Sequence, residues 1–284
     1  MARTPSAEYL ILDIETIPDV ERWKRPDVTQ PTTSGGADAA VVAQAAPTPA
    51  LSSAPAGKPD RAGFPPTWAH RIVVIGCLWL DHGYKLKRLG VVGDPTGGEG
   101  SPDQRERSLL EDFSRFVGKA RPVLVTYNGR SFDLPVIAMR SLCHGISLGW
   151  YYKERNVRYR YSEEGHLDLC DWLADHGATR SGSLDAVARL IGLPGKIGVD
   201  GSQVEGLYQA GQLADIQKYC LADVAQTALL FLRFRLLQGV LSPDGYHEAA
   251  SGLLDALAAD GRVGTVLEGT DRAHLIGPAP APTT

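Results

Sequence analysis

The sequence predicts a single α/β domain with a mixed central sheet of about five strands flanked by helices. Apolar runs with strand character alternate with stretches of helical periodicity along most of the chain. A short turn joins the second and third of these runs, so we expect an antiparallel hairpin within the sheet. The chain has 284 residues, 43% of them hydrophobic, which is enough for one large core.

Strands are expected at residues 8–14, 70–80, 84–92 and 122–127. In each of these segments a short apolar run is bounded by turn residues or polar residues. The tripeptide Asp81-His82-Gly83 between the second and third strands is typical of a hairpin turn.

Helices are expected where apolar residues recur at a spacing of three or four. The first covers residues 101–117 and ends at Gly118, and the second covers 134–143 with Pro135 in its first turn. The same spacing predicts further helices at 168–175, 184–191, 213–237 and 245–259.

The domain is expected to consist of residues 1–27 and 67–240. Between them, residues 28–66 are dominated by Ala, Pro, Gly, Ser and Thr. Such a segment buries too little apolar surface to offset its ordering entropy, so we predict a flexible low-complexity insert. Residues 241–284 are expected to form a C-terminal helix followed by a disordered tail.

Charge and cysteine usage exclude several classes of protein. The formal net charge of −4 gives no indication of a polyanionic partner. No apolar run reaches the ~18 residues of a membrane-spanning helix, and the N-terminus lacks a signal-peptide pattern, so no membrane partner is expected. The four cysteines are scattered, without a C-x-x-C pair, which indicates reduced thiols in a cytoplasmic protein.

The first candidate motif is Asp13-Ile14-Glu15, at the end of the first strand. Residues two apart on a strand share a face, so both carboxylates project together beside the core. They repel each other and are costly to desolvate unless a cation neutralises them, and a divalent metal ion suits that role. The pattern is also expected by chance in a chain this acidic. Asp19-Val20-Glu21 is a second copy in a polar stretch, where we expect solvated side chains.

Two further motifs carry aspartates. Tyr219 and Asp223 are four residues apart on the predicted helix 213–237 and therefore lie on one face, directed inward. Asp133 follows a tight turn between a strand and a helix. Each has a structural alternative, because Tyr219 and Asp223 could simply share a hydrogen bond in the core and Asp133 could cap its helix.

Taken in chain order, the three motifs resemble a known class of enzyme. The words LDIETIP, YNGRSFDLPVI and YCLADVAQT are similar to the motifs of 3′–5′ exonucleases that have four metal-binding carboxylates and a tyrosine in the last motif, the DEDDy type. The branch they resemble is the one related to the exonuclease domain of family-B DNA polymerases. HLDLCD at 166–171 and the segment 183–204 also resemble that branch, and the resemblance covers about 8–17 and 70–237.

The resemblance implies a ribonuclease-H-like fold and an active site with two divalent ions, Mg²⁺ or Mn²⁺. It implies that Asp13 bridges both ions and that Glu15 and Asp223 help to hold the ion that activates water. Asp133 would support the second ion through water, and Tyr219 would position the attacking water. The ordinary tyrosine pKa of about 10 makes a role as general base difficult at neutral pH.

Substrate contacts are expected around the motifs and in one basic segment. Residues 150–161 interleave tyrosines with cations, and stacking on Tyr151 with phosphate contacts from Arg155 and Arg158 would form a track for a single strand. The alternative for this segment is a twisted strand pair or a loop with a solvated basic edge. The other residues expected to contact the substrate are Ile14, Thr16, Asn128, Phe132 and Lys196, the last of which could instead cap a turn.

The resemblance thus implies an enzyme that releases nucleoside 5′-monophosphates from the 3′ end of DNA, with single-stranded DNA favoured. Two alternatives stay open from the sequence. One is a non-catalytic nucleic-acid-binding module of the same fold, which the presence of all four carboxylates and the tyrosine argues against. The other is an exoribonuclease, since selection for the 2′-hydroxyl is not visible in these residues.

Overall fold

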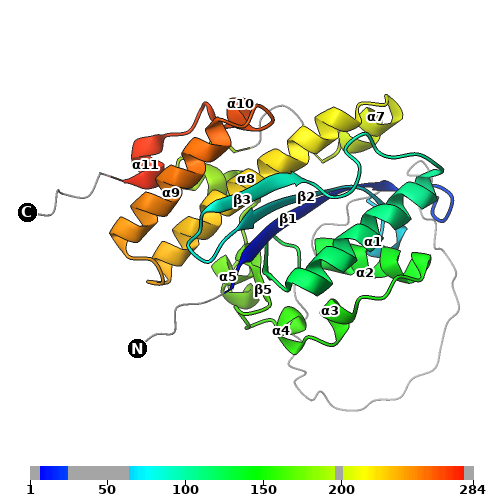
Figure 1. Ribbon diagram of the computed structural model, residues 1–284, viewed down its shortest axis with the longest axis horizontal. Helices are drawn as coiled ribbons and strands as arrows, with labels where there is room; N and C mark the ends of the chain where they lie inside the picture. The colour runs from blue at the N-terminus through cyan, green and yellow to red at the C-terminus, as the bar shows by residue number, and fades with distance from the viewer. Residues whose placement is uncertain (1–6, 25–63, 196–200, 278–284) are drawn as a thin grey trace, which may run out of the picture.

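The computed structural model describes residues 7–24, 64–195 and 201–277 (Figure 1). Its five-stranded sheet has the order β3-β2-β1-β4-β5, so the expected mixed α/β architecture is confirmed. Most of the insert expected at 28–66 and the tail beyond residue 277 lie outside the described residues.

The sheet combines an antiparallel meander with two parallel strands. The strands are β1 (Tyr9–Pro18), β2 (His70–Leu80), β3 (Leu86–Val91), β4 (Val123–Thr126) and β5 (His166–Asp168). β2 is antiparallel to both β1 and β3, whereas β4 is parallel to β1 and β5 is parallel to β4. Successive residues of β1 therefore alternate between the two faces of the sheet.

Two layers of helices cover these faces. Leu10, Leu12 and Ile14 of β1 pack with α1 (Pro102–Ala120) and α2 (Asp133–His144). Tyr9 and Ile11 point to the other face and pack with the long helix α8. Figure 1 shows α1 and α2 on one side of the sheet and α8 on the other. Asp13 and Glu15 have the parity of Tyr9 and Ile11, so their side chains lie on the α8 face.

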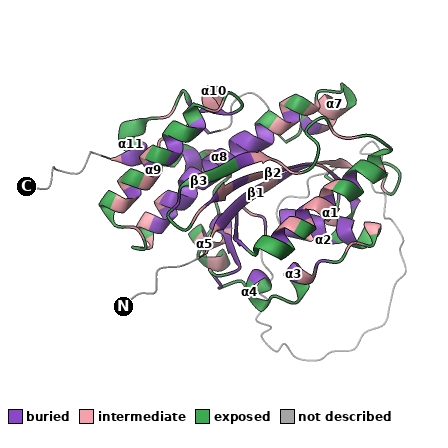
Figure 2. Cartoon of the chain, in the orientation of Figure 1, coloured by how far each residue is buried: buried purple, intermediate pink, exposed green. Residues whose placement is uncertain are grey.

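Helix α8 (Leu213–Leu237) has the bounds expected from its sequence and is buried on nearly all sides (Figure 2). Such a helix is apolar around most of its circumference because it lies between the sheet and another helix layer. That layer begins with α9 (Pro243–Ala258), whose Leu253, Leu254 and Leu257 are buried in the same core as α8. The division into a domain of residues 1–27 and 67–240 and a C-terminal region of residues 241–284 stays a prediction.

The remaining helices are short. They are α3 (Gly149–Tyr152), α4 (Arg155–Arg158), α5 (Leu169–Leu173), α6 (Leu184–Leu190), α7 (Val204–Gln209), α10 (Gly264–Leu267) and α11 (Arg272–Ile276), with single 3-10 turns at Thr67–Ala69 and Asp175–Gly177. Within the described ranges, no helix combines the length and the apolar character needed to cross a membrane.

One expected element was wrong, and the structural alternative for one segment does not hold. The helix predicted at 168–175 is shorter, and the residues before it form the strand β5. This strand has three residues, all of them buried, which is too few for an alternating pattern to be recognised in the sequence. The segment 150–161 is neither a strand pair nor a plain loop, because it contains the two helical turns α3 and α4.

Candidate active site

Strand β1 places the first two carboxylates of the candidate site. Asp13 lies opposite Gly76 of β2 in the register, and Glu15 lies opposite Val74, just before an irregularity in the pairing between Glu15 and Thr16. Asp13 is half-buried and Glu15 is buried. Both side chains are on the α8 face, where burial leaves little water to solvate them.

Helix α8 brings the third motif against β1. Tyr219, Cys220 and Asp223 are all buried, and the Sγ atom of Cys220 lies 3.5 Å from the main-chain oxygen of Asp13 and 3.6 Å from its Oδ2. This approach requires glycine at position 76, because a Cβ atom there would lie 2.7 Å from the Cys220 Sγ and 3.2 Å from Val224. Gly76 therefore sets the distance between α8 and the strand that carries Asp13.

The second motif reaches the same place from the other side of β1. Asp133 is the first residue of α2, and its Oδ1 accepts a hydrogen bond of 3.1 Å from the main-chain N–H of Ile14. The N-cap of α2 is Phe132, so Asp133 does not occupy the capping position that its structural alternative required. Asp133 is thus attached to β1 at the residue between the two carboxylates of the first motif.

The charges of three other carboxylates act on Asp13. Burial, followed by the charges of Asp133, Glu15 and Asp223, raises the pKa of Asp13 well above its ordinary value. Burial is also the main reason that the pKa of Asp133 rises to about 7. Like charges in a low-dielectric site are costly, so this arrangement favours binding of a cation. A set of hard oxygen donors fits Mg²⁺ or Mn²⁺.

Tyr219 stays a neutral phenol in this environment. Burial raises its pKa above the ordinary value, and the charges of Asp223, Glu15 and Asp13 raise it further. Its side chain also hydrogen-bonds to Asp223, the contact that the structural alternative for this pair required.

A buried aspartate that sequence reasoning missed holds the turn before Asp133. Asp168, at the end of β5, accepts 2.8 Å hydrogen bonds from the main-chain N–H groups of Asn128 and Arg130, and a 3.1 Å bond from that of Cys170. Asn128 has a φ of 68°, in the left-handed region that asparagine tolerates better than most residues. The available signal was an aspartate in HLDLCD between a strand and a helix, a common position for an N-cap.

A histidine joins two of the expected substrate contacts. His70 Nε2 lies 2.9 Å from the carbonyl oxygen of Pro65, which can only accept, so Nε2 carries the proton. Nδ1 then accepts from the hydroxyl of Thr16 at 2.9 Å, and burial lowers the His70 pKa, which favours this neutral form. Phe132 and Phe64 both lie with ring centroids 5.0 Å from the imidazole. Thr16 and Phe132 therefore lie together beside the first two motifs.

The match to a known family covers the second and third motifs of the candidate site, and the first motif lies before the matched residues. Residues 62–268, more than half of the chain, match the profile of a family described as a predicted 3′-5′ exonuclease related to the exonuclease domain of PolB. The chain belongs to this exonuclease family. The family that the motifs resemble is confirmed, and the five-stranded mixed sheet agrees with the ribonuclease-H-like fold that the resemblance implied.

Curated relatives of this exonuclease-family chain include large polymerases. It is 25% identical over 137 residues to the catalytic chain of DNA polymerase epsilon from Schizosaccharomyces pombe, a match that covers 45% of the chain and 6% of the polymerase. It is 33% identical over 89 residues to the corresponding polymerase epsilon chain of Dictyostelium discoideum, covering 30% of the chain and 4% of the polymerase. The chain therefore corresponds to a small part of each relative.

Similar solved structures have low sequence identity to this chain. The family B DNA polymerase of the hyperthermophilic archaeon Pyrobaculum calidifontis has a TM-score of 0.49 and 18% identity, covering 95% of this chain and 27% of the polymerase chain. Exonuclease I of E. coli, solved with a 5cy-dT13 oligonucleotide, has a TM-score of 0.35 and 12% identity, covering 84% of this chain and 45% of the enzyme chain.

The remaining expected contacts of the exonuclease-family site are distributed unevenly. The side chain of Ile14 lies in the core on the α1 and α2 side, so only its main chain reaches the site. Lys196 lies outside the described residues. Tyr151, Arg155 and Arg158 lie on α3 and α4, where the Arg158 guanidinium lies 5.7 Å from the Tyr151 ring centroid.

The expectation that the side chains of Asp19-Val20-Glu21 are solvated was wrong for Asp19. β1 continues to Pro18, and this extension carries Asp19 into the interior, where it is only 1% exposed. Its carboxylate pairs with Arg140 of α2 at 2.8 Å and with Arg22 at 2.8 Å. Asp19 is therefore a buried ion-pair residue.

A second cluster with the spacing of metal ligands is neutralised by arginines. Asp103, Glu106 and His144 lie close together, but Glu106 is paired with Arg140 at 2.5 Å and Asp103 with Arg71 at 2.8 Å. These guanidinium groups already supply the positive charge that a metal ion would bring.

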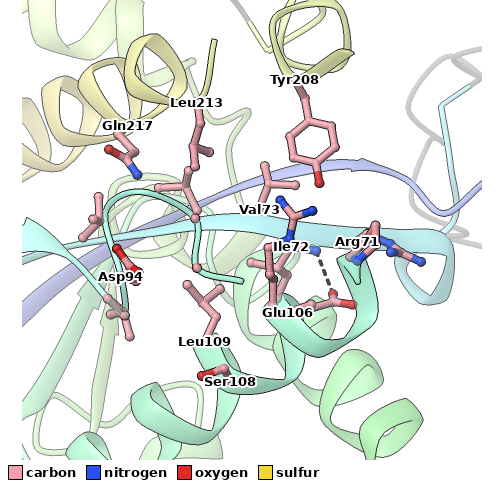
Figure 3. A pocket seen from close by; sticks show the side chains of 18 of the residues that line it. Arg71, Ile72, Val73, Asp94, Glu106, Ser108, Leu109, Tyr208, Leu213 and Gln217 are labelled. Carbon is pink, nitrogen blue, oxygen red and sulfur yellow. Dashed lines mark hydrogen bonds between the residues drawn. The ribbon is translucent and has the colours of Figure 1, made fainter. Parts of the chain in front are cut away.

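Two cavities lie near α8. One, of about 270 Å³, lies between β2, α1 and α7, and Figure 3 shows Arg71, Glu106 and Tyr208 at one end of it. The other, of about 290 Å³, has Tyr219 and Asp223 in its wall. The second cavity thus adjoins the candidate active site.

Proposed function

We propose that this protein is a metal-dependent 3′–5′ exonuclease that hydrolyses phosphodiester bonds from the 3′ end of DNA, with single strands favoured, and releases nucleoside 5′-monophosphates. The observation that carries the proposal is the convergence of three distant segments at residues 13–15 of β1, with α8 on one side of the strand and α2 on the other. They bring the half-buried carboxyl group of Asp13 and the buried carboxyl groups of Glu15, Asp133 and Asp223 together with the hydroxyl of Tyr219.

The donor set supports a role in holding divalent ions. Asp13, Glu15 and Asp223 would hold Mg²⁺ or Mn²⁺, and Asp133 would support a second ion. Two such ions, when bound, stabilise the attacking and leaving oxygens of an in-line phosphoryl displacement. The elevated pKa values of Asp13 and Asp133 support this role, because these groups gain most from a nearby cation.

The proposed role of Tyr219 is to orient the attacking water. Its raised pKa keeps the phenol protonated at neutral pH, so it does not accept the proton from water. A neutral hydroxyl anchored to Asp223 holds a hydrogen-bonded water in one direction, which lowers the entropic part of the barrier. Removing the hydroxyl should therefore slow the reaction without abolishing it.

The end of the nucleic acid would lie against Thr16 and Phe132. Thr16 follows Glu15 directly in the sequence, and Phe132 directly precedes Asp133. His70 holds Thr16 through a hydrogen bond and Phe132 through a ring contact. The basic and aromatic surface of α3 and α4 would contact the strand further from its end. Arg130 connects this surface to the turn before Asp133, because its Nη1 donates to the main-chain oxygen of Arg158 at 3.1 Å.

The test is digestion of matched 5′-labelled DNA and RNA, single- and double-stranded, with Mg²⁺, Mn²⁺ or EDTA. We expect a ladder that shortens from the 3′ end of single-stranded DNA when either metal is present. Asp13→Ala and Asp223→Ala should lower the rate by at least about a hundredfold, and Tyr219→Phe by about ten- to a hundredfold.

The matched control is Asp112→Asn, an exposed carboxylate on α1. Circular dichroism and thermal unfolding verify that each variant is folded. Digestion by Asp13→Ala at the wild-type rate would overturn the assignment. A ladder on RNA alone would change the substrate, and binding without any digestion would favour the non-catalytic module.

A further inference from the structure

Cys220 adds a sulfur atom to the candidate active site. The ligand atoms of Asp13, Glu15 and Cys220 all lie within 4.8 Å of one another. The separation between the Cys220 Sγ and the Asp13 Oδ2 is 3.6 Å. No role in the proposed hydrolysis requires this thiol, so its position beside two carboxylates needs a separate explanation.

The distance between the Cys220 Sγ and the Asp13 Oδ2 suits two ligands of one small ion. Zinc binds cysteine sulfur at about 2.3 Å and carboxylate oxygen at about 2.0–2.2 Å, so two such ligands at a tetrahedral angle lie about 3.5 Å apart. The 3.6 Å between Sγ and Oδ2 is close to this value. One ion could therefore contact both atoms with little movement of α8.

Ligand chemistry separates this ion from the one needed for hydrolysis. Magnesium takes hard oxygen donors, whereas thiolate sulfur selects softer ions such as Zn²⁺ and Cd²⁺. The charge balance also differs from that of the Asp103, Glu106 and His144 cluster, where arginines neutralise the carboxylates. In the described ranges, no lysine or arginine is within ion-pair distance of Asp13, and the charges that act on it are carboxylates.

We propose that Asp13, Glu15 and Cys220 form an inhibitory site for a soft divalent cation, with Zn²⁺ and Cd²⁺ as the chemical class. Binding replaces the thiol proton, which is released to solvent, and the thiolate and two carboxylates become the ligands. The cation occupies carboxylates that Mg²⁺ would use, so it blocks hydrolysis. This consequence rests on the proposed exonuclease function, but the existence of the site does not.

The binding test uses Cd²⁺ alone, because a cadmium–thiolate bond has a charge-transfer absorption in the ultraviolet. Cys143 is exposed, so Cys143→Ser is used as the background to remove surface binding. We expect one equivalent of Cd²⁺ to produce the absorption in this background. The signal should disappear in Cys143→Ser/Cys220→Ser and persist in Cys143→Ser/Cys77→Ser, since Cys77 packs in the core on the α1 and α2 side.

The second readout is inhibition of the Mg²⁺-supported reaction by Zn²⁺, measured as a fraction of each variant's own rate. The concentration for half-inhibition should rise at least about tenfold in Cys220→Ser, because loss of a direct ligand costs at least as much affinity as loss of an outer partner. Equal sensitivity of both proteins, or a cadmium absorption that survives Cys220→Ser, would show that the thiol only hydrogen-bonds to Asp13. If no variant has nuclease activity, the exonuclease proposal fails while the cadmium titration still decides this one.

Discussion

Asp133 illustrates the free-energy cost of burying a carboxyl group beside others. Its pKa rises to about 7, first because burial disfavours the charged form and also because of the charge of Asp168. An unfolded aspartate has a pKa of about 3.9. The folded protein therefore binds a proton at Asp133 between about pH 4 and pH 7 that the unfolded chain does not bind. The stability that results is complete below about pH 4 and is lost as the pH rises through about 7.

Asp133→Asn should remove this pH dependence. In EDTA at pH 8, the variant is expected to have a free energy of unfolding about 1–4 kcal/mol higher than the wild type, with little difference below pH 4. The amide oxygen can still accept the hydrogen bond from Ile14. Urea denaturation across this pH range measures the effect, and the exposed Asp112→Asn serves as the control. If the unfolding free energy of Asp133→Asn depended on pH as that of the wild type does, Asp133 would not be protonated at pH 6 in the folded protein.

Among individual residues, the sequence indicated those that belong to short local motifs. The motifs around Asp13, Asp133 and Tyr219 were visible because the residue types and spacings are local. Asp168 and His70 were missed because their partners are main-chain atoms or side chains far along the chain. Asp168 binds the N–H of Asn128, 40 residues away, and no local pattern encodes such a contact.

The spacing between elements is controlled by small groups at their contact. Gly76 lets α8 pack directly on β2, with Cys220 and Val224 in the space that a side chain would fill. Gly76→Ala should force α8 outward and lower the free energy of unfolding by about 1–3 kcal/mol. A displacement of about 1 Å in Asp223 can reduce the rate by about a hundredfold.

Nuclease assays and urea denaturation of Gly76→Ala measure these two effects separately. The matched control is Gly252→Ala in α9, where a Cβ atom meets nothing within 4 Å. This change should stabilise the helix by about 0.5–1 kcal/mol. Full activity in Gly76→Ala would show that α8 tolerates the added methyl group without moving Asp223.

A buried ion-pair network joins α1 and α2 to the end of β1. Arg140 of α2 donates to Glu106 of α1 and to Asp19 after β1, and all three residues are buried. Arg140→Ala removes the arginine partner of buried Glu106 and one of the arginines paired with Asp19, and is expected to destabilise the protein by about 3–5 kcal/mol. The exposed pair of Arg115 with Asp112 offers a control, since Arg115→Ala should cost less than about 1 kcal/mol. If Arg140→Ala and Arg115→Ala lost equal stability in thermal unfolding, burial of the Arg140 network would not be the cause of its contribution.

Long, strongly patterned elements were predicted more accurately than short ones. The strand 70–80 and the helix 213–237 have the expected bounds, because each has enough residues for its apolar pattern to be distinctive. The strand β5 and the helices α3 and α4 have three or four residues each, and packing against neighbouring segments determines their conformation. Gly165, for example, allows the main chain of Asn156 and Val157 to approach β5 closely.

The whole molecule depends on the layer formed by α9, α10 and α11. Leu257, Val263, Leu267 and Leu275 of this region are buried in the core that contains α8. A chain shortened to residue 240 should therefore lose cooperative unfolding or unfold well below the wild type in calorimetry. The point variant Leu257→Ala should cost about 2–5 kcal/mol. An unchanged unfolding temperature for the shortened chain would show that this layer is dispensable.

The same layer determines when a nascent chain can acquire its native core. Asp13 is synthesised early, whereas Tyr219 and Asp223 emerge much later, on a helix whose outer side is covered by residues after Pro243. Domains form their cores as cooperative units during synthesis, so α8 cannot be secured against β1 until these covering helices have left the ribosome. The proposed active site is therefore expected to form late in translation, after the covering helices have been synthesised.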